Sequence, residues 1–235
     1  MLLCFGSFIM MPIREGPMCD VDHRGERTFV SRGGTKLENA LHATGLEVAG
    51  RRALDVGAST GGFTDCLLQS GATDVVAVDV GYGQLDWGLR NDPRVHVLER
   101  TNARALDPEM LPYTPDLVTI DVSFISLAKI LPAVLGCLAA RYDVLALVKP
   151  QFEVGRALAS KGRGVIRDPG DRRMALVGVG EAAFGLGASV LGYHSSGLAG
   201  PKGNLETFLW LAEPGRAGGA QDAREIEKMA RKVEP

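Results

Sequence analysis

Four ionisable residues adjoin apolar segments of the chain, where a charge is costly unless it has a partner or a task. Asp121 and Lys149 each follow an apolar run that predicts a strand, and Glu206 stands where a third such run begins. Lys36 lies in an earlier segment with helical spacing of apolar residues. Because open α/β sheets place their sites at the carboxyl ends of the strands, we expect the two lysines and two carboxylates to converge.

Such a cluster would perform acid–base chemistry on a hydroxyl group. A lysine whose pKa is lowered by desolvation and by a neighbouring ammonium can remove a hydroxyl proton, so Lys149 is the candidate general base. Asp121 and Glu206 would hold the two ammonium groups in register, and Lys36 would supply the like charge. The alternative is structural: Lys36 solvated on its helix, Asp121 capping a helix, and Lys149 and Glu206 in buried ion pairs.

A second pattern, LDVGASTGGFTD at 54–65, predicts a strand that ends near Asp55 and opens through a glycine turn into a helix. The glycines are Gly57, Gly61 and Gly62. Glycine lets the backbone approach a ligand, and the start of a helix offers free N–H groups. Asp79 ends the next predicted strand, where a carboxylate can accept both hydroxyl hydrogens of a ribose. The two features together predict a cofactor that contains a nucleoside.

The spacing of the turn indicates which cofactor this is. A nicotinamide cofactor requires G-x-G-x-x-G, whereas this turn is D-x-G-x-x-x-G-G, and no tyrosine is followed four residues later by lysine as in short-chain dehydrogenases. We therefore favour S-adenosylmethionine. The alternative is that the glycines only shape a tight turn and that Asp79 merely ends a strand.

Composition limits the classes of protein that are possible. With 235 residues and 46% hydrophobic content, the chain can bury one substantial core, and a net charge of -2 restricts any nucleic-acid contact to a local patch. The four cysteines, Cys4, Cys19, Cys66 and Cys137, form no C-x-x-C pair, which favours reduced thiols in a cytoplasmic protein without a metal site. The apolar start of the chain lacks a basic region and is too short to span a bilayer, so we expect no membrane association.

Strand-like and helix-like segments alternate along the chain, which predicts an α/β fold with a doubly wound, mostly parallel sheet. Seven strands are expected, at residues 52–56, 74–80, 95–98, 116–120, 143–148, 188–194 and 205–212, with helices at 34–44 and 172–185 among the connections. The last two strands form a hairpin-like pair, so the last strand is antiparallel. Residues 1–30 are expected to be a poorly ordered lead-in, and 214–235 a charged tail in which Ile226, Met229 and Val233 have the spacing of a short amphipathic helix.

The chain resembles the TlyA family over residues 29–212. The resemblance is carried by SRGGTKLENAL, LDVGASTGGFTDCLL, VDVGYGQLDW, ERTNAR, DVSFISL, VKPQFE and GPKGNLE. TlyA proteins, some of them called hemolysins, are similar to the FtsJ-type ribose 2′-O-methyltransferases, and the family modifies ribosomal RNA with S-adenosylmethionine as methyl donor. The resemblance implies a Rossmann-like methyltransferase domain at residues 31–213, with ribosomal RNA or a ribosomal subunit as its partner.

The resemblance also implies roles for individual residues. Its catalytic tetrad corresponds to Lys36, Asp121, Lys149 and Glu206. The methionine side of the cofactor would be lined by Gly57, Ser59, Gly61, Gly62 and Phe63, with Asp79 at the ribose and Asn102 near the adenine. Asp55 and Asp121, at the tips of their strands, are counted with the cofactor site.

Members of the family usually carry a small amino-terminal RNA-binding domain, for which the residues before SRGG are too few. A partial substitute is the stretch 156–173, in which six basic residues face two acids beside several glycines, as in a mobile loop that contacts phosphates. The candidate RNA contacts are Arg156, Lys161, Arg163 and Arg167. The alternative for this stretch is an ordinary solvated loop.

Ribose is the preferred acceptor of the methyl group. Enzymes that methylate amino groups of bases resemble one another in an Asn/Asp-Pro-Pro-aromatic segment, and residues 121–124 lack both prolines. Methylation at carbon 5 of cytosine needs a nucleophilic cysteine, whereas the apolar surroundings of Cys137 indicate a packing role. Two other classes stay open: an RNA- or cofactor-binding protein without turnover, and a membrane-active hemolysin.

Overall fold

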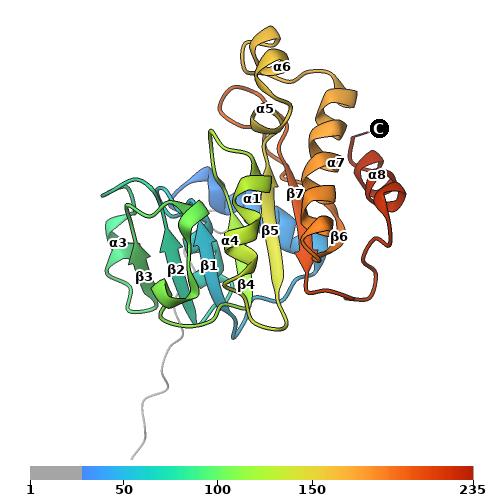
Figure 1. Cartoon of the computed structure of the whole chain (residues 1–235). Coiled ribbons are helices and arrows are strands. Elements are labelled where there is room, and N and C mark those ends of the chain that lie inside the picture. The colour runs from blue at the N-terminus through green and yellow to red at the C-terminus, as the bar shows by residue number, and fades with distance from the viewer. Residues whose placement is uncertain (1–27, 235) are drawn as a thin grey trace, which may run out of the picture.

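A computed structural model of the chain describes residues 28–234, and within this range seven strands form one sheet in the order β3-β2-β1-β4-β5-β7-β6 (Figure 1). The strands are β1 (Arg52–Val56), β2 (Asp74–Val78), β3 (Val95–Leu98), β4 (Leu117–Ile120), β5 (Asp143–Val148), β6 (Ser189–Ser195) and β7 (Thr207–Ala212). All pairs among β1 to β5 are parallel, whereas β7 is antiparallel to both β5 and β6. The predicted mostly parallel sheet with an antiparallel last strand is confirmed.

Some strands are shorter than the sequence predicts at the end that carries chemistry. β2 ends at Val78 rather than at residue 80, because the Asp79 carboxylate accepts a hydrogen bond from the Gly81 N–H at 2.6 Å and turns the chain away from the sheet. β7 begins at Thr207 rather than at residue 205, so Glu206 precedes the strand. The Asp79 and Glu206 carboxylates therefore lie in the connections beside β2 and β7, where the backbone is not held in the extended conformation of a strand.

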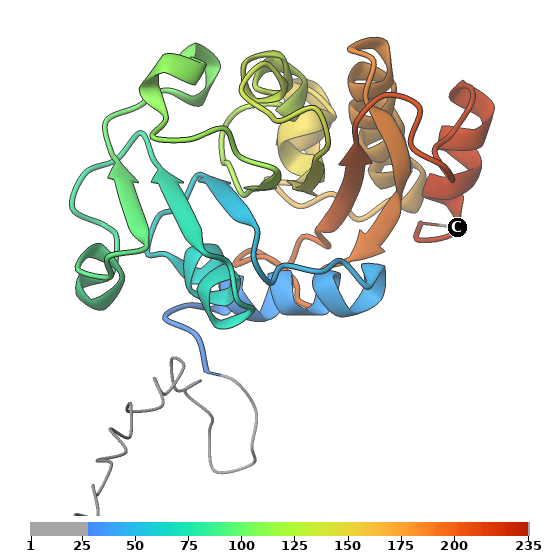
Figure 2. The ribbon, with the colours of Figure 1, turned by 90° about the horizontal axis from the view of Figure 1, so that it is seen from below.

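Helices cover both faces of the sheet, as Figure 2 shows, with α1 and α2 on one face and α4, α7 and α8 on the other. Their bounds are α1 (Arg32–Thr44), α2 (Gly62–Gln69), α3 (Trp87–Arg90), α4 (Leu131–Leu135), α5 (Pro150–Glu153), α6 (Arg156–Lys161), α7 (Pro169–Gly185) and α8 (Ala223–Arg231). Short 3-10 turns lie at η1 (Ala103–Ala105), η2 (Pro108–Met110) and η3 (Leu127–Lys129). The fold is thus doubly wound, with helices on both faces of the sheet.

The core lies between the sheet and these two helix layers. Every residue of β5 is buried, as expected of a central strand that is covered on both faces. On one face Leu145 and Phe208 pack with Leu37 of α1, and on the other Val144 and Leu209 pack in a cluster with residues of α4, α7 and α8. Each fully buried side chain of this size stabilises the fold by about 1.5–3 kcal/mol. This packing makes the strand ends a rigid support for the site.

Helix α1 begins two residues before its predicted start because Ser31 caps it. The Ser31 Oγ accepts a hydrogen bond from the Gly33 N–H at 3.3 Å, which satisfies one of the free donors of the first turn. At the other end Gly45 has the left-handed conformation, with φ 67°, that the sequence predicts for a C-cap glycine. Between these caps, Lys36 is only 7% exposed, so α1 presents an ammonium group to the interior rather than to solvent.

The stretch 156–173, expected to be a loop, is largely helical. Helix α6 covers Arg156–Lys161, and α7 begins at Pro169, three residues before its predicted start. Asp168 caps α7 by accepting a hydrogen bond from the Asp171 N–H at 3.0 Å. Pro169 is favourable at the first helical position, because the N–H that it lacks would have no partner within the helix. The interpretation as a mobile loop missed this capping signal.

Two regions at the ends of the chain complete the description. The lead-in expected at residues 1–30 falls mostly on residues 1–27, which lie outside the described residues. In the tail, α8 packs on α7 and buries Ile226 and Ala230. Among the helices of residues 28–234, the structure contains none that is long and apolar enough to cross a membrane.

Candidate active site

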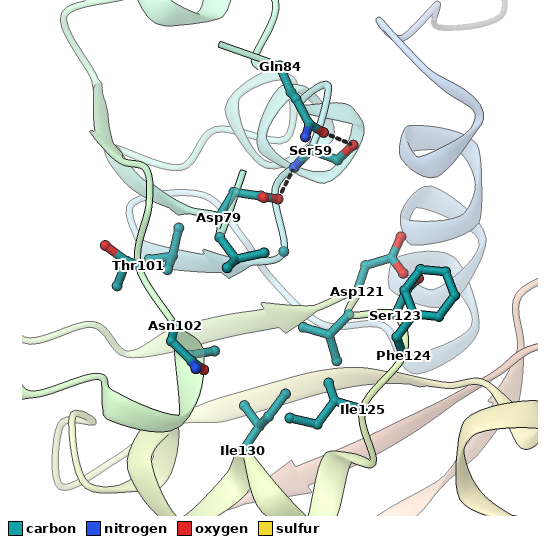
Figure 3. Close-up of a pocket in the computed structure, with 15 residues that line it drawn as sticks. Ser59, Asp79, Gln84, Thr101, Asn102, Asp121, Ser123, Phe124, Ile125 and Ile130 are labelled. Carbon is teal, nitrogen blue, oxygen red and sulfur yellow. Dashed lines mark hydrogen bonds between the residues drawn. The ribbon is translucent and has the colours of Figure 1, made fainter. Parts of the chain in front are cut away.

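The turns that follow β1, β2, β3 and β4 surround a pocket of about 510 Å³ (Figure 3). Five residues expected at the cofactor line it: Gly57, Ser59, Asp79, Asn102 and Asp121. The volume is within the range of about 300–1,000 Å³ that is typical of small-molecule sites. The pocket lies where the strand order reverses between β1 and β4, which is where doubly wound sheets bind their ligands.

Gly57 is required by both its conformation and its neighbours. Its φ of 88° is unfavourable for any other residue, and a Cβ there would overlap the main-chain oxygen of Asp121. Gly62 has a different constraint, since a Cβ would overlap the Ser31 Oγ at the start of α1. The glycines therefore let the loops after β1 and β4, and the starts of α1 and α2, approach one another closely.

The Asp79 carboxylate is fixed by the turn after β1. Its Oδ2 accepts a hydrogen bond from the Ser59 N–H at 2.8 Å, and its Oδ1 accepts the Gly81 N–H bond. A carboxylate has about four lone-pair positions, so two backbone bonds leave acceptors for a diol. Figure 3 shows Asp79 beside Ser59 and Gln84 at one end of the pocket. Its position on the wall fits the predicted contact with ribose hydroxyls.

The far end of the pocket is more apolar. Ile125 and Ile130 line it together with Asn102, whose Oδ1 accepts a hydrogen bond from the Arg104 N–H at 3.1 Å (Figure 3). An apolar slot with one amide at its edge suits a flat heterocycle such as adenine. The sequence analysis did not select the apolar residues, because nothing distinguishes them from core positions until the fold brings them to the pocket.

A second pocket, of about 420 Å³, adjoins the first. Both pockets are lined by Gly57, Ser59, Asp121 and Ser123, so these residues lie between them. The second pocket adds Lys36, Phe63, Gly62 and Lys149 to its wall. Two adjoining pockets are what a transfer between a cofactor and a separate acceptor requires.

Two ion pairs stand at the second pocket. Lys149 Nζ lies 2.6 Å from Asp121 Oδ1 and donates a hydrogen bond to Ser123 Oγ at 2.9 Å. Lys36 Nζ lies 2.5 Å from Glu206 Oε2. Lys36, Asp121 and Lys149 line the pocket, whereas Glu206 does not and stands behind Lys36. Each lysine thus has its own carboxylate. The amine of Lys149 lies beside Asp121, which lines both pockets.

Asp55, expected at the cofactor, has a different position. It is fully buried and accepts hydrogen bonds from Thr64 Oγ1 at 2.7 Å and Thr119 Oγ1 at 3.0 Å, so it links β1, α2 and β4. Desolvation raises the pKa of Asp55 to about 7, although both threonine hydrogen bonds act in the opposite direction. Neither Asp55 nor Gly61 lines either pocket. Their expected cofactor contacts have no counterpart in the pocket walls.

Phe124 is a feature that the sequence analysis missed. Its side chain is 91% exposed, its φ of 66° is unusual for a residue with a Cβ, and its ring lies 5.2 Å from that of Phe152. Phe124 lines the first pocket beside Ser123 and Asp121 (Figure 3). A strained, exposed aromatic ring at the mouth of a site indicates contact with a ligand.

Three of the candidate RNA contacts lie apart from both pockets, and the side chain of the fourth, Arg156, is outside the part of the chain that the structure describes. Lys161, Arg163 and Arg167 are exposed, and none of them lines either cavity. The segment is nevertheless tied to the site, because Asn204, two residues before Glu206, accepts a hydrogen bond from the Ile166 N–H at 2.9 Å.

Solved S-adenosylmethionine-dependent methyltransferases with 13% and 17% sequence identity to this chain have the same Rossmann-like fold. The model of the FtsJ-like methyltransferase family matches residues 29–213. The 16S/23S rRNA (cytidine-2′-O)-methyltransferase TlyA of Mycobacterium tuberculosis is 57% identical over 186 residues, which cover 79% of this chain and 69% of that protein. Hemolysin A of Brachyspira hyodysenteriae is 44% identical, with 76% and 74% covered.

A crystal structure of a Lactococcus lactis protein described as a candidate hemolysin has a TM-score of 0.79 and 45% identity, and the match covers 88% of this chain and 99% of that one. The chain belongs to the FtsJ-like methyltransferase family, among its TlyA members. It is an S-adenosylmethionine-dependent methyltransferase. The residues of the first pocket fit this cofactor, because the Asp79 carboxylate has acceptor positions left for a ribose diol and the opposite end is apolar enough for a base.

Proposed function

We propose that this chain methylates a ribose 2′-hydroxyl of ribosomal RNA in the cytoplasm. The observation that carries the proposal is Lys149, whose amine lies in the second pocket beside a wall that both pockets share. The mycobacterial relative is a cytidine-2′-O-methyltransferase of 16S and 23S rRNA by name, which supports the same acceptor. A ribose hydroxyl also explains the choice of RNA over DNA.

In this reaction the chain binds and orients both reactants. When bound, S-adenosylmethionine supplies the electrophilic methyl group. Asp79 would hold the cofactor ribose and Asn102 would border its adenine, while the Gly57 turn and Asp121 stand between the two pockets. Orientation of an acceptor against such an electrophile contributes about 7–11 kcal/mol, more than any single acid–base group. Binding geometry is therefore the main contribution of the protein.

The lysines and carboxylates act on the hydroxyl. In its neutral amine form, Lys149 accepts the 2′-hydroxyl proton at Nζ as the oxygen attacks the methyl group, and Asp121, 2.6 Å away, stabilises the ammonium that results. Ser123 fixes the amine from a second direction. Lys36, held by Glu206, lies on the same pocket wall and supplies a positive charge near the developing oxyanion. A general base of this kind contributes on the order of a hundredfold to ten-thousandfold.

RNA binding is assigned to the basic stretch. Lys161, Arg163 and Arg167 are exposed and form a local positive surface on a protein whose net charge is -2, and the sequence adds Arg156 to the candidate contacts. Contacts to phosphates orient an RNA without reading its sequence. The nucleotide to be modified would then be selected at Phe124, whose exposed ring can stack on a base.

The test is transfer of a labelled methyl group from S-adenosylmethionine to ribosomal subunits and to naked rRNA, followed by mapping of the modified nucleotide. We expect the label on a ribose 2′-oxygen, and Lys149→Met should lower turnover on the order of a hundredfold or more while cofactor affinity is kept. Lys129→Met is the matched control, because Lys129 is an exposed lysine outside both pockets. Full activity of Lys149→Met would remove this residue from the mechanism.

The two alternatives give different results in the same assays. A binding protein without turnover would retain the cofactor and RNA yet transfer no label to any ribosomal substrate. A membrane-active hemolysin would release dye from lipid vesicles in the absence of cofactor. Label on a base rather than on ribose would contradict the assignment of the acceptor.

A further inference from the structure

The segment that follows the methyltransferase domain is anchored by a buried ion pair. Arg172 of α7 donates two hydrogen bonds to Glu234, from Nε to Oε1 at 2.8 Å and from Nη2 to Oε2 at 2.7 Å. Arg173 Nη1 also donates to the main-chain oxygen of Glu234 at 3.1 Å. The Arg172 and Glu234 side chains are only 12% and 7% exposed. Loss of either partner of a charge pair this shielded is costly, because the other charge is left buried and uncompensated.

The same guanidinium group holds the backbone of the basic stretch. Arg172 Nη1 donates to the main-chain oxygen of Arg167 at 2.6 Å and lies 3.4 Å from that of Ile166. From the other side, Asn204 accepts the Ile166 N–H bond and donates from Nδ2 to the Gly164 oxygen at 2.8 Å. Residues 164–167 are therefore fixed between α7 and the loop that leads to Glu206.

Helix α8 brings Glu234 to this position. Figure 1 shows α8 beside α7, and the buried Ile226 and Ala230 provide its packing surface. The Glu234 N–H continues the helical direction by donating to the Ala230 oxygen at 3.0 Å. Residues 223–234 lie beyond the 29–213 that match the family model, and the proposed reaction gives them no task.

We propose that residues 223–234 position the RNA-binding surface, and that Glu234 acts through Arg172 as a positioning residue. The pair holds the backbone at residues 166 and 167, so that the exposed Arg163 and Arg167 keep one arrangement for contacts with RNA phosphates. A fixed arrangement lowers the conformational entropy that is lost when RNA binds. The inference rests on the proposed RNA methylation.

The sign of the effect separates positioning from electrostatics. Removal of the Glu234 carboxylate makes the chain more positive by one charge, and long-range attraction alone would then strengthen RNA binding. Loss of the fixed backbone would weaken it. The direction of the change in RNA affinity therefore identifies the role.

The experiment measures cofactor Kd, and kcat and KM for ribosomal subunits, for the full chain and its variants. We expect Glu234→Ala to raise the RNA KM roughly tenfold, with the cofactor Kd unchanged. Glu227→Ala is the matched control, because it removes the same charge from α8 but breaks only an exposed pair with Arg231 at 2.6 Å. Arg172→Lys should raise the KM as well, since lysine keeps the charge but cannot bind Glu234 and the carbonyls together.

The outcomes distinguish this inference from the proposed function. If Glu234→Ala and Arg172→Lys have the same RNA KM as Glu227→Ala, while Arg163→Ala and Arg167→Ala raise it, the positioning role is overturned and RNA binding by the basic stretch stands. If the Arg163 and Arg167 variants leave the RNA KM unchanged, the basic stretch does not bind RNA. The proposed RNA-binding surface and the positioning role of Glu234 are then both overturned. If Glu234→Ala does not fold, the Arg172→Lys result decides.

Discussion

The ammonium group of Lys36 and the carboxylate of Glu206 lie 2.5 Å apart although 170 residues separate them in the sequence. Their side chains are 9% and 2% exposed, so neither charge is solvated by bulk water. The pair joins α1, which lies on one face of the sheet, to the connection that enters the antiparallel strand β7. The pair is thus a contact, with Lys36 on the wall of the second pocket, between two elements that share no strand pairing.

Lys36→Met should destabilise the fold by about 3–5 kcal/mol, because it leaves the Glu206 carboxylate buried without a partner. In Lys36→Met/Glu206→Gln both charges are gone, so we expect urea unfolding to show most of the stability restored. Methyl transfer should stay low in both variants, since the positive charge at the pocket is absent. Recovery of activity in the double variant would mean that the pair serves stability alone.

Asp79→Ala should weaken S-adenosylmethionine binding by at least about tenfold, because hydrogen bonds to a charged acceptor contribute about 1.5–3 kcal/mol. Isothermal titration calorimetry measures this change directly. Asp86→Ala is the control: Asp86 also accepts a backbone N–H bond, from Gly88 at 2.8 Å, but it does not line the cofactor pocket. Equal affinities of the two variants would refute the ribose contact.

Phe124→Ala should lower kcat/KM for RNA by about 10- to 100-fold, as expected when a stacking contact of about 1–3 kcal/mol is lost. Phe124→Gly should lower it equally but unfold at higher denaturant concentration, because glycine adopts the φ of 66° without strain. Phe184→Ala, on the partly exposed surface of α7, provides the comparison. Normal RNA kinetics of Phe124→Ala would exclude stacking at this ring.

Asp55 predicts a pH dependence of stability. Burial raises its pKa to about 7 in the folded chain, above the unfolded value of 3.8, so the folded state retains a proton that the unfolded state has lost. The Asp55 contribution to the free energy of unfolding is therefore highest below about pH 4, falls as pH rises toward 7 and is constant above it. The change is at most roughly 4 kcal/mol.

Asp55→Asn has nearly the same shape and no charge, so it should remove this dependence. The free energy of unfolding, measured with urea, should therefore be higher for Asp55→Asn relative to the parent chain at pH 8 than it is relative to the parent chain at pH 5. An identical pH profile in the two proteins would show that Asp55 is not protonated in the fold.

The sequence alone determined the sheet, its mostly parallel character and the turn at Gly57. Apolar runs of strand length that alternate with helical segments define a parallel sheet locally, because such strands are buried on both faces. A glycine turn and an acid at two successive strand ends are also local signals, which is why the pocket at Gly57 and Asp79 could be predicted before any coordinates. Helix α6 was not predicted, because its sequence is short and contains no apolar repeat of helical period.

Only the tertiary structure decided which lysine pairs with which carboxylate. The pairing of Lys149 with Asp121 follows from β4 and β5 being neighbours, and the pairing of Lys36 with Glu206 from the return of β7 beside β5. The exposed ring of Phe124, the burial of Asp55 behind the pocket and the link from Glu234 to the basic stretch likewise had no local signature. Periodicity reports how a segment is buried, whereas contacts between distant residues depend on strand order and on the path of each connection.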